Sequence, residues 1–497
     1  NAEFKYTRMG NMGLAVLPAV PTRAHLKPKS GAFFAQPQEI QLDQPLEFLW
    51  SNDVAQHAAS VDLNGDGLLD LVLVRAVMRP NAAGTMDANT LVLLAAKNHA
   101  FHPEPDHALA RLAGASVNSI LFGDIDGDGR VDAYICRTGR NLLLLQNEHG
   151  EFFDATERWN AAGPSGSCSD GALADLDHDG DLDLLLLYRD APIELLANTG
   201  NALFRAIGEQ SGLAAEQHAP ISVVVGDFDY DRDADILILN QVPPHQLFLN
   251  DRLWKWTPGT APGISADQLL DMASSAAIVE IADLPLRRAV FASAGYLRLA
   301  NRVVPMKVNR AVEVGASDIT GDGQIDLMVF GMDHIAMHDE SGRLVQEFAV
   351  PPLAFRTQLV TLDPTRGAHL ITLRNGASPL LWEPGPARGS FAAISFSGRI
   401  DPSQSMRSNI SGIGTAYAAR IGTQWAGGEM FRLQTGRSQS LAPVSVGIGA
   451  ASQIDLLEVD WSDGVLQSEL DLTAGATHAL VETQRQISSC PVLFAWN

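Results

Sequence analysis

The sequence lacks the features that several protein classes require. Its 497 residues include three cysteines, which are too few for a disulfide scaffold. No apolar run approaches the ~20 residues that a helix needs to cross a bilayer, so we expect no membrane insertion. Lysine and arginine number 35 against 58 acidic residues, which gives a net charge of −23 at pH 7. Because nucleic acid phosphates bind basic surfaces, this charge argues against a nucleic acid partner.

The sequence leaves the oxidation state of Cys136 and Cys168 open. A Cys136–Cys168 bridge is one state, and two unpaired buried thiols are the interpretation that we favour. Cys490 lies far from both in the sequence.

Sequence patterns typical of enzymes are also missing. The 13 histidines include no HExxH pair, and no glycine-rich phosphate loop opens a helix. The stretch closest to a nucleophile elbow, GPSGS at 163–167, departs from the G-x-S-x-G pattern. Acidic residues are abundant, so counting them leaves a glycosidase pair of carboxylates open as an alternative. We therefore expect a protein that is not an enzyme.

What the sequence does contain is an acidic nine-residue motif in five copies. Each copy is followed at once by a short apolar run, and several are also preceded by one. Such runs, bounded by turn residues, predict buried strands, so the repeating unit is strand, acidic loop, strand. The copies read DLNGDGLLD at 62–70, DIDGDGRVD at 124–132, DLDHDGDLD at 175–183, DFDYDRDAD at 227–235 and DITGDGQID at 318–326.

The spacing of the copies predicts the number of units. Their first residues are 62, 51, 52 and 91 positions apart, and the last gap is nearly two units long. We therefore place a unit that has lost its acids at 279–293, where Asp283 is the one acid left in the loop, and a further unit at 359–373. About seven units of ~35–60 residues predict an all-β fold, a seven-bladed β-propeller rather than a solenoid.

The acidic loop has the composition of a cage for a hard cation. In a tight loop, positions 1, 3, 5 and 9 can turn toward one centre, and a backbone carbonyl and a water complete six to eight oxygens. Three or four carboxylates favour calcium over magnesium, and the lack of histidine or cysteine at ligand spacing argues against zinc or copper. His178 occupies an outward-facing position, where we expect it to be solvated rather than a ligand.

These positions give the predicted ligands for up to five calcium ions. In the fourth loop Arg232 stands where glycine is expected, which puts the occupancy of that loop in question. In the fifth loop a threonine hydroxyl is a weaker ligand at position 3. The predicted ligands are Asp62, Asn64, Asp66 and Asp70; Asp124, Asp126, Asp128 and Asp132; Asp175, Asp177, Asp179 and Asp183; Asp227, Asp229, Asp231 and Asp235; and Asp318, Thr320, Asp322 and Asp326.

The acidic loops differ from EF-hands and from metal-free turns. An EF-hand needs a bidentate glutamate at position 12 and flanking helices, but position 12 is aliphatic in all five copies. Turns rich in Asp-Gly are common between strands without any metal. Five copies with the same acid spacing are hard to explain as turns alone, because packed carboxylates repel one another.

The residue pattern of the sequence changes after residue 388. Acidic loops stop, and alternating strands predict a small β-sandwich-like domain at 389–486. We assign 46–388 to the propeller, 1–45 to an N-terminal arm or linker, and 487–497 to a tail or the start of a further segment.

Both regions resemble known families. The acidic loops with their apolar runs resemble the FG-GAP or VCBS-type repeats of integrin α-chain propellers and of many bacterial extracellular proteins. SNISGIG at 408–414 and SVGIGAASQIDLLEVDWSDG at 445–464 resemble the ASPIC/UnbV domain, also found in cartilage acidic protein. Ser462-Asp463 departs from the Pro-containing pair frequent in that family. The resemblance implies a seven-bladed, calcium-bound propeller, secreted or at the cell surface, with a binding role.

The functional expectation is a non-catalytic, calcium-stabilised interaction protein that presents a propeller face to a protein or glycan. Sites of this kind bind calcium at about 10⁻⁴–10⁻³ M, so they fill in a calcium-rich compartment, which is extracellular, at the cell surface or periplasmic. The alternative is a propeller-type enzyme that acts on a polysaccharide or phosphoester in the central channel. A third interpretation makes the chain a subunit of a larger assembly.

Overall fold

The structure is a computed structural model in which strands dominate. Among the described residues, the helical elements with defined bounds are the four-residue α-helix α1 (Ala266–Leu269) and the short 3₁₀ turns η2 (Ala108–Arg111) and η3 (Pro364–Arg366). None of the helices in the described part of the chain combines the length and hydropathy needed to span a bilayer. The all-β prediction is confirmed. The structure describes residues 4–6, 16–18, 31–43, 54–76, 90–97, 100–112, 116–213, 219–250, 254–280, 287–299, 302–307, 311–374, 377–401, 406–436 and 438–483.

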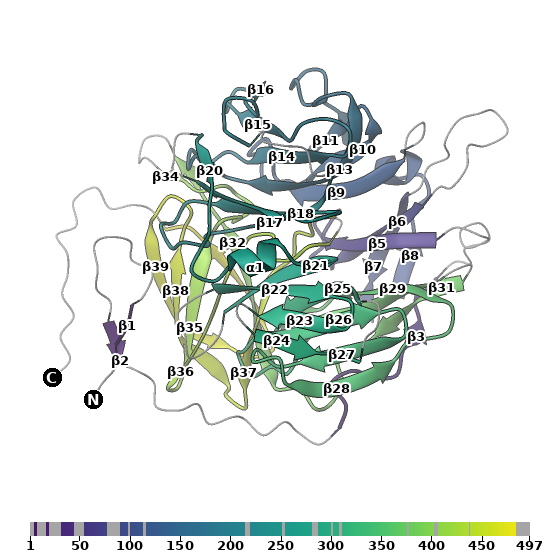
Figure 1. The fold of residues 1–497 in the computed structure, drawn as a ribbon, viewed down its shortest axis with the longest axis vertical. Helices are drawn as coiled ribbons and strands as arrows, with labels where there is room; N and C mark the ends of the chain where they lie inside the picture. The colour runs from purple at the N-terminus through teal and green to yellow at the C-terminus, as the bar shows by residue number, and fades with distance from the viewer. Residues whose placement is uncertain are drawn as a thin grey trace.

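Seven antiparallel meanders of four strands each follow one another along the described chain (Figure 1). The second and third are joined into one sheet where β10 pairs briefly with β13. The first three meanders are β5 (Val54–Val61), β6 (Asp70–Ala76), β7 (Thr90–Ala96) and β8 (Ala100–Pro103); β9 (Val117–Gly123), β10 (Asp132–Gly139), β11 (Leu142–Gln146) and β12 (Phe152–Asp154); and β13 (Gly166–Ala174), β14 (Asp183–Tyr188), β15 (Glu194–Asn198) and β16 (Phe204–Ala206).

The remaining meanders repeat the same order, and the last takes its fourth strand from the N-terminal region. They are β17 (Pro220–Gly226), β18 (Asp235–Asn240), β19 (Gln246–Asn250) and β20 (Trp256–Pro258); β21 (Ser275–Glu280), β22 (Arg287–Ser293), β23 (Tyr296–Leu299) and β24 (Arg302–Pro305); β25 (Ala311–Ser317), β26 (Asp326–Gly331), β27 (His334–His338) and β28 (Leu344–Ala349); and β29 (Ala354–Val360), β30 (His369–Arg374), β31 (Ala377–Trp382) and β3 (Gln38–Glu39).

The first strands of the meanders form a closed succession. Each of β9, β13, β17, β21 and β25 contacts the first strand of the next meander, and β29 contacts β5. At the closing contact, the amide of Gln358 exchanges two hydrogen bonds with the backbone of Ala58, at 3.1 and 2.7 Å. Between the first and second meanders, His57 Nε2 lies 2.9 Å from the carbonyl of Asn118. This arrangement is of the β-propeller kind.

Each sheet packs one face against the preceding meander and the other face against the following one. Leu121 and Tyr134 from the second meander pack with Leu173 and Leu184 from the third, and all four are buried. Burial on both faces explains why the strands are continuous apolar runs rather than alternating ones. The unit expected at 359–373 is present as β29, η3 and β30. Asp283, in the unit expected at 279–293, lies outside the described residues, between β21 and β22.

Residues 31–43, for which the sequence predicted an arm or linker, join the first and last meanders. Strand β3 pairs with β31, and β4 (Gln41–Leu42) runs parallel to β8. Phe34 is buried beside them, with the guanidinium of Arg388 4.3 Å from its ring centroid. Two-residue strands carry no alternation, which is why the sequence pattern did not reveal them. Two further strands, β1 (Phe4–Tyr6) and β2 (Val16–Pro18), pair only with each other.

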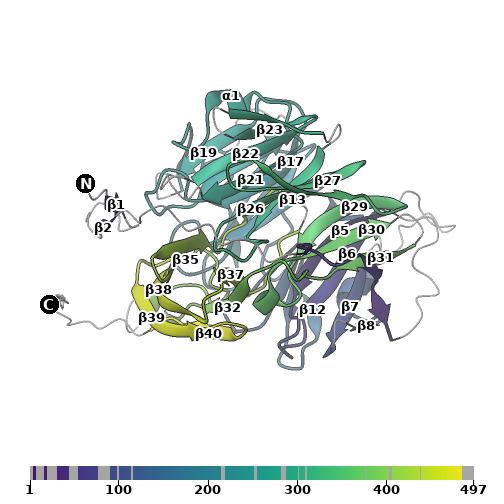
Figure 2. The same cartoon turned by 90° about the horizontal axis from the view of Figure 1, so that it is seen from below.

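The C-terminal domain is a separate pair of sheets (Figure 2). The sheets β37-β32-β40 and β36-β35-β38-β39 enclose one apolar core that includes Phe396, Leu457 and Trp461. The change of sheet falls between Trp382 and Ser390. The strands are β32 (Ser390–Ser397), β33 (Ile400–Asp401), β34 (Met406–Arg407), β35 (Ala416–Ile421), β36 (Gln424–Glu429), β37 (Val444–Gly449), β38 (Gln453–Asp460), β39 (Leu466–Thr473) and β40 (Thr477–Val481). The tail predicted at 487–497 lies outside the described residues.

One segment of the C-terminal domain leaves it to cross the ring of meanders. We call residues 431–436 and 438–441, between β36 and β37, the axial segment. Its backbone forms bridges with β5, β9 and β21, which are first strands of three meanders. The segment therefore lies along the axis that the first strands surround.

Phe34 offers a test of the N-terminal closure. We expect Phe34→Ala to lower the free energy of unfolding by about 3 kcal/mol, because a buried aromatic ring is lost and leaves a cavity. Phe153 in β12 is 42% exposed, so Phe153→Ala is the matched control and should change it by less than about 1 kcal/mol. Urea denaturation measures both. Equal effects of the two substitutions would show that residues 31–43 do not hold the meanders together.

Candidate metal centre

Each acidic loop connects the first and second strands of its meander. The aspartate at position 9 is in every case the first residue of the second strand, as Asp132 is of β10. Because the loop has the same place in each meander, the five loops lie at one end of the ring. The sequence prediction of strand, acidic loop, strand is confirmed for all five copies.

The position-9 aspartates are buried and hold the loop to the sheet. Asp132 accepts hydrogen bonds from the backbone N–H of Ile125, at 2.8 Å, and of Gln146 in β11, at 2.9 Å. Asp183 and Asp235 repeat this pattern with their own loop and third strand. The acid spacing predicted these residues only as ligands. Their structural role was missed because the backbone donors are invisible in the sequence.

The position-1 aspartates fold the loop back on itself. Asp124 accepts the N–H groups of Gly127, Asp128 and Gly129, at 2.8, 3.1 and 2.7 Å. Asp62 and Asp318 accept the three equivalent N–H groups in their own loops.

This geometry requires positive φ at positions 4 and 6, which glycine supplies at 74° and 87° in the second loop. In the fourth loop Tyr230 and Arg232 adopt φ of 69° and 80° without glycine. The arginine that put this loop in question therefore takes the same backbone conformation as glycine does elsewhere.

Carboxylates converge in three of the loops. In the second, third and fourth loops, one oxygen from each aspartate at positions 1, 3 and 9 lies within 4.8 Å of the others. In the first and fifth loops position 3 is Asn64 or Thr320, so the same positions offer two carboxylates and one neutral oxygen. The three groups are Asp124, Asp126 and Asp132; Asp175, Asp177 and Asp183; and Asp227, Asp229 and Asp235.

The position-5 aspartates stand outside these groups. In each loop this carboxylate accepts the N–H of position 7, as Asp128 does from Arg130 at 3.0 Å. The same bond recurs at 2.8 Å from Leu68 to Asp66 and at 3.0 Å from Gln324 to Asp322. A metal-ligand role for position 5 stays a prediction.

Side chains from the next meander link successive loops. Gln146 donates to the carbonyl of Leu63 in the first loop at 2.7 Å. Asn198 donates in the same way to Ile125 in the second loop, at 3.1 Å. The amide of Asn250 donates to Leu176 in the third loop, also at 3.1 Å. In the sequence, each of these three residues ends the apolar run of its third strand, a local signal that the acid spacing does not include.

Burial and mutual repulsion disfavour the charged form of these acids. Burial, reinforced by Asp126 and Asp124, raises the pKa of Asp132 to about 8. Burial likewise raises the pKa of Asp235 to about 8 and that of Asp318 to about 7, each with neighbouring carboxylates adding to the shift. A dication among these carboxylates would favour their ionised form.

The donor set fits a hard cation. All of the converging atoms are oxygens, which is what calcium prefers. In the third loop, Asp175 Oδ1 is buried and has no hydrogen-bond partner, a cost that a bound cation would remove. Residues of the chain therefore match the implied metal, with Asp175, Asp177 and Asp183 as the clearest set.

The C-terminal domain contacts the second, fourth and fifth acidic loops. Ser411 Oγ accepts the N–H of Asp124 at 2.7 Å, and Gly449 N–H donates to Gly321 of the fifth loop at 2.7 Å. Arg232 of the fourth loop pairs with Asp460 of β38. This interdomain pair gives Arg232 a role that its own loop did not suggest.

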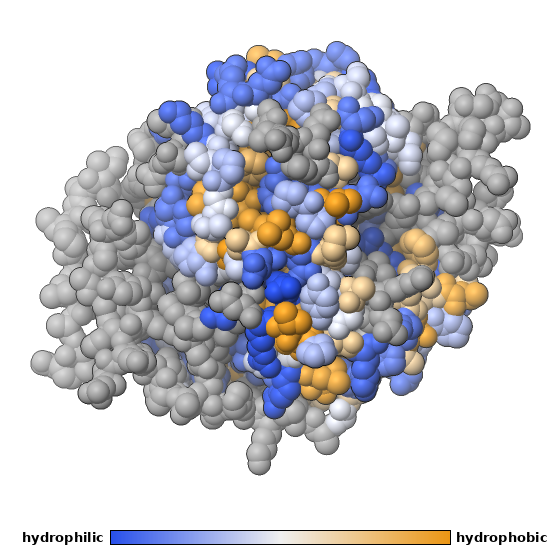
Figure 3. Space-filling model, in the orientation of Figure 1, coloured by the Kyte–Doolittle hydropathy of each residue, from blue (hydrophilic) through white to orange (hydrophobic). Residues whose placement is uncertain are grey.

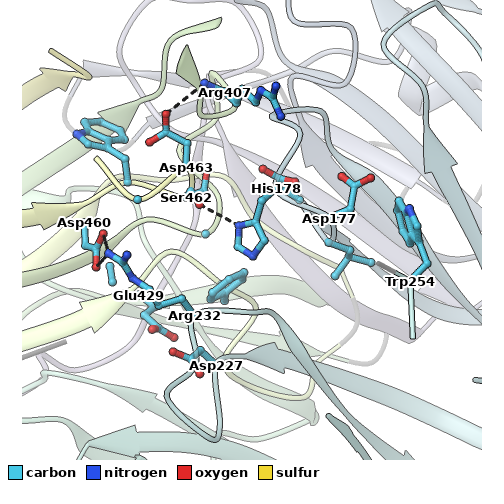
Figure 4. A pocket seen from close by; sticks show the side chains of 17 residues that line it. Asp177, His178, Asp227, Arg232, Trp254, Arg407, Glu429, Asp460, Ser462 and Asp463 are labelled. Atoms are coloured by element: carbon cyan, nitrogen blue, oxygen red, sulfur yellow. Dashed lines mark hydrogen bonds and ion pairs between the residues drawn. The ribbon is translucent and has the colours of Figure 1, made fainter. Parts of the chain in front are cut away.

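His178 is not solvated as the sequence predicted. Its Nδ1 lies 2.9 Å from the carbonyl of Ser462 (Figure 4). Its Nε2 lies 2.9 Å from Asp233 Oδ1. Nothing in the local sequence indicates that a second domain lies over this loop. The expectation that His178 faces open solvent is therefore wrong.

A cavity of 580 Å³ lies between the third and fourth loops and the C-terminal domain. Asp177 and Asp227 line it from the loops, and Asp463 lines it from the C-terminal domain (Figure 4). Trp254 forms part of its wall. The cavity gives two of the three-carboxylate groups access to space within the domain junction.

The two thiols in the described chain are unpaired. Cys136 and Cys168 are both buried in the core between the second and third meanders, and both are free. This agrees with the favoured interpretation of two buried thiols rather than a bridge.

Comparison with protein families identifies both regions of the chain. A model of FG-GAP-like repeats matches residues 62–135, 124–186 and 175–238, which span the first four acidic loops. A model described as ASPIC and UnbV matches residues 405–487. The chain therefore carries FG-GAP-like repeats followed by an ASPIC/UnbV domain. No curated protein matched the sequence.

Solved structures give only distant similarity. An Agrocybe aegerita lectin that recognises non-reducing terminal N-acetylglucosamine is 18% identical, with 62% of this chain and 83% of that one covered and a TM-score of 0.42. BBS1N in complex with ARL6DN is 10% identical over 71% and 96% of the two chains, with a TM-score of 0.44. A Bacillus licheniformis rhamnogalacturonan lyase is 10% identical over 87% and 93%, with a TM-score of 0.36. These scores carry no argument about function.

The two roles of loop aspartates can be separated within one loop. We expect Asp132→Ala to lower the free energy of unfolding by about 2 kcal/mol or more in chelator, because two buried N–H groups lose their acceptor. Asp128→Ala is the matched control and should cost less than about 1 kcal/mol, because the N–H of Arg130 is open to water. Urea denaturation at pH 6 measures both, because this pH lies below the pKa of about 8 of Asp132, so the carboxyl is mainly neutral and contributes little charge repulsion. A cost for Asp128→Ala as large as that for Asp132→Ala would contradict this assignment.

Proposed function

We propose that this chain of FG-GAP-like repeats and an ASPIC/UnbV domain is a calcium-stabilised, non-catalytic binding protein built on a seven-bladed propeller. The observation that carries the proposal is the convergence of three carboxylates at the same positions of three successive loops. Repetition of one oxygen cage in equivalent places is typical of a scaffold that is fastened by cations. The rest of the proposal concerns what the cations hold and what the scaffold binds.

Calcium would join parts of the chain that are distant in sequence. A cation between Asp124, Asp126 and Asp132 would fix the connection between β9 and β10. The same loop supports the C-terminal domain through Ser411, so ordering the loop also orders the domain junction. By mass action, a cation that binds only the folded chain stabilises it. Weak sites of this kind fill in a calcium-rich compartment, so we place the protein outside the cell, at its surface or in the periplasm.

The groups along the axis support a binding role over catalysis in a central channel. The described residues of the axial segment occupy this space, and two ion pairs lie beside them. Asp170 pairs with Arg432 of the axial segment, and Glu313 pairs with Arg356. All four side chains are largely buried, so they serve as structural ion pairs rather than as an open acid–base cluster.

The end of the ring opposite the acidic loops is the surface that we assign to a partner. Connections between second and third strands, and from one meander to the next, lie at this end because the strands are antiparallel. These connections carry exposed apolar side chains, and apolar residues gather near α1 in Figure 3. Patches of this kind mark interaction sites, which fits a protein or a glycan with apolar faces. The side chains are Val242, Leu270, Met272, Met332 and Leu353.

Removal of calcium tests the proposal that cations stabilise the fold. At 1 mM calcium, a site with a dissociation constant near 10⁻⁴ M adds about 1.4 kcal/mol of stability, so three sites would add about 4 kcal/mol. We expect a chelator to lower the melting temperature by several degrees and calcium to restore it, with magnesium less effective. Differential scanning calorimetry at constant ionic strength measures the shift.

A matched variant identifies the source of that shift. Asp126→Asn, Asp177→Asn and Asp229→Asn together remove one charge from each converging group without a change of shape. In chelator the triple variant should melt at or above the wild-type temperature, because repulsion among the carboxylates is relieved, and it should gain little in calcium. An equal calcium response in both proteins would place the cations elsewhere, and no response in the wild type would end the proposal.

The partner surface has its own test. We expect Met272→Glu and Met332→Glu to reduce recovery of a partner from the native source at least about tenfold, because a charge is placed on an apolar contact. Calcium stabilisation should be unchanged, since both residues lie at the end opposite the loops. Val303→Glu is the control, because Val303 is exposed in β24 at an outer edge of the ring. If only Val303→Glu reduced recovery of the partner, the partner would bind at the outer edge of the ring instead.

A further inference from the structure

The axial segment bonds to the first strands as an added strand would. The N–H groups of Val225 and Ile278 donate to the carbonyls of Arg432 and Leu433, at 2.9 and 2.7 Å. Further along, the N–H of Phe122 donates to the carbonyl of Gln439 at 3.1 Å. First strands face the axis and have no further strand there, so their inward N–H groups need this acceptor.

Side chains of the axial segment also bond to backbone of the ring. Gln439 accepts from the N–H of Leu173 at 2.9 Å and donates to its carbonyl at 3.1 Å. Gln434 accepts from the N–H of Ala316 in β25 at 2.9 Å. Ser440 accepts from the N–H of Ser60 in β5 at 3.1 Å. Together with the backbone bonds, the segment reaches first strands of the first six meanders.

A buried ion pair fixes the position of the segment. The guanidinium of Arg432 donates to both carboxylate oxygens of Asp170 in β13, at 2.9 and 2.6 Å. The side chains are 4% and 0% exposed. Asp170 also accepts from the hydroxyls of Ser119 and Ser222, at 3.0 and 2.7 Å, so two neighbouring strands meet at the same carboxylate. Withdrawal of Arg432 would leave this carboxylate buried without its countercharge, which is strongly unfavourable.

We propose that the axial segment is an internal peptide ligand of the meander ring. Bound in this way, it makes the ring and the C-terminal domain one cooperative unit and closes the axis to any external ligand. The binding mode is addition of an extended segment to exposed backbone, with Arg432 as the anchor that sets its register. This role does not depend on calcium, so it stands apart from the function proposed above.

Hydrogen exchange of the full-length chain tests this proposal directly. The amides of Phe122, Val225 and Ile278 report on the bound segment, and that of Leu457 in β38 reports on the C-terminal core. In the wild type we expect all four to exchange at the rate of global unfolding, with the same dependence on denaturant. Exchange of the three axial amides through small fluctuations, while Leu457 stays protected, would overturn the proposal.

Two variants and a control extend the test. Arg432→Ala should speed exchange of the axial amides by at least about a hundredfold and split the single unfolding transition into two. If that variant does not fold, Gln439→Ala gives a milder test, in which the axial amides should exchange about tenfold faster. The control is Arg343→Ala, which removes an exposed arginine paired with Asp339. It should change neither the exchange rates of the axial amides nor the number of unfolding transitions. Unchanged exchange and one transition in both test variants would show that the segment lies on the axis without holding the domains together.

Discussion

Each acidic loop depends on one buried carboxylate, the aspartate that begins the second strand of its meander. Asp132 accepts backbone N–H groups from its own loop and from the third strand, so it fastens the loop to the sheet. Its burial beside Asp124 and Asp126 also makes its negative charge costly. The same arrangement therefore shapes the loop and creates a place where a cation is favoured. The loop geometry, the proposed calcium sites and the position of the C-terminal domain on the loops all depend on this buried carboxylate.

The C-terminal domain is part of the propeller's architecture rather than an appendage. It contacts several of the acidic loops, as Arg232 does with Asp460, and it supplies the axial segment. Under the proposed function, a cation that orders these loops would also order the domain junction. Met272 and Met332, at the end of the ring opposite the acidic loops, are exposed. The surface proposed to bind a partner is therefore separate from the loops proposed to bind cations.

Periodic features of the fold were predictable from the sequence, and contacts between distant segments were not. The acid spacing around Asp124 indicated the loops, and the apolar runs after them indicated the second strands, because both signals are local and repeated. Strand β3 was missed because two residues cannot show alternation. The environment of His178 was predicted wrongly because Ser462, its partner, is in another domain. The role of Arg432 was invisible for the same reason, since Asp170 is distant in sequence.

Calcium stoichiometry is the most direct test of the central claim that cations fasten the acidic loops. Equilibrium dialysis of the demetallated chain over calcium concentrations from about 0.05 to about 10 mM would count the ions bound at saturation and give their dissociation constants, with the triple aspartate-to-asparagine variant as the reference. We predict at least three ions per chain, with dissociation constants of about 10⁻⁴–10⁻³ M, and fewer in the variant. Binding of no calcium above the level of the variant would contradict the claim.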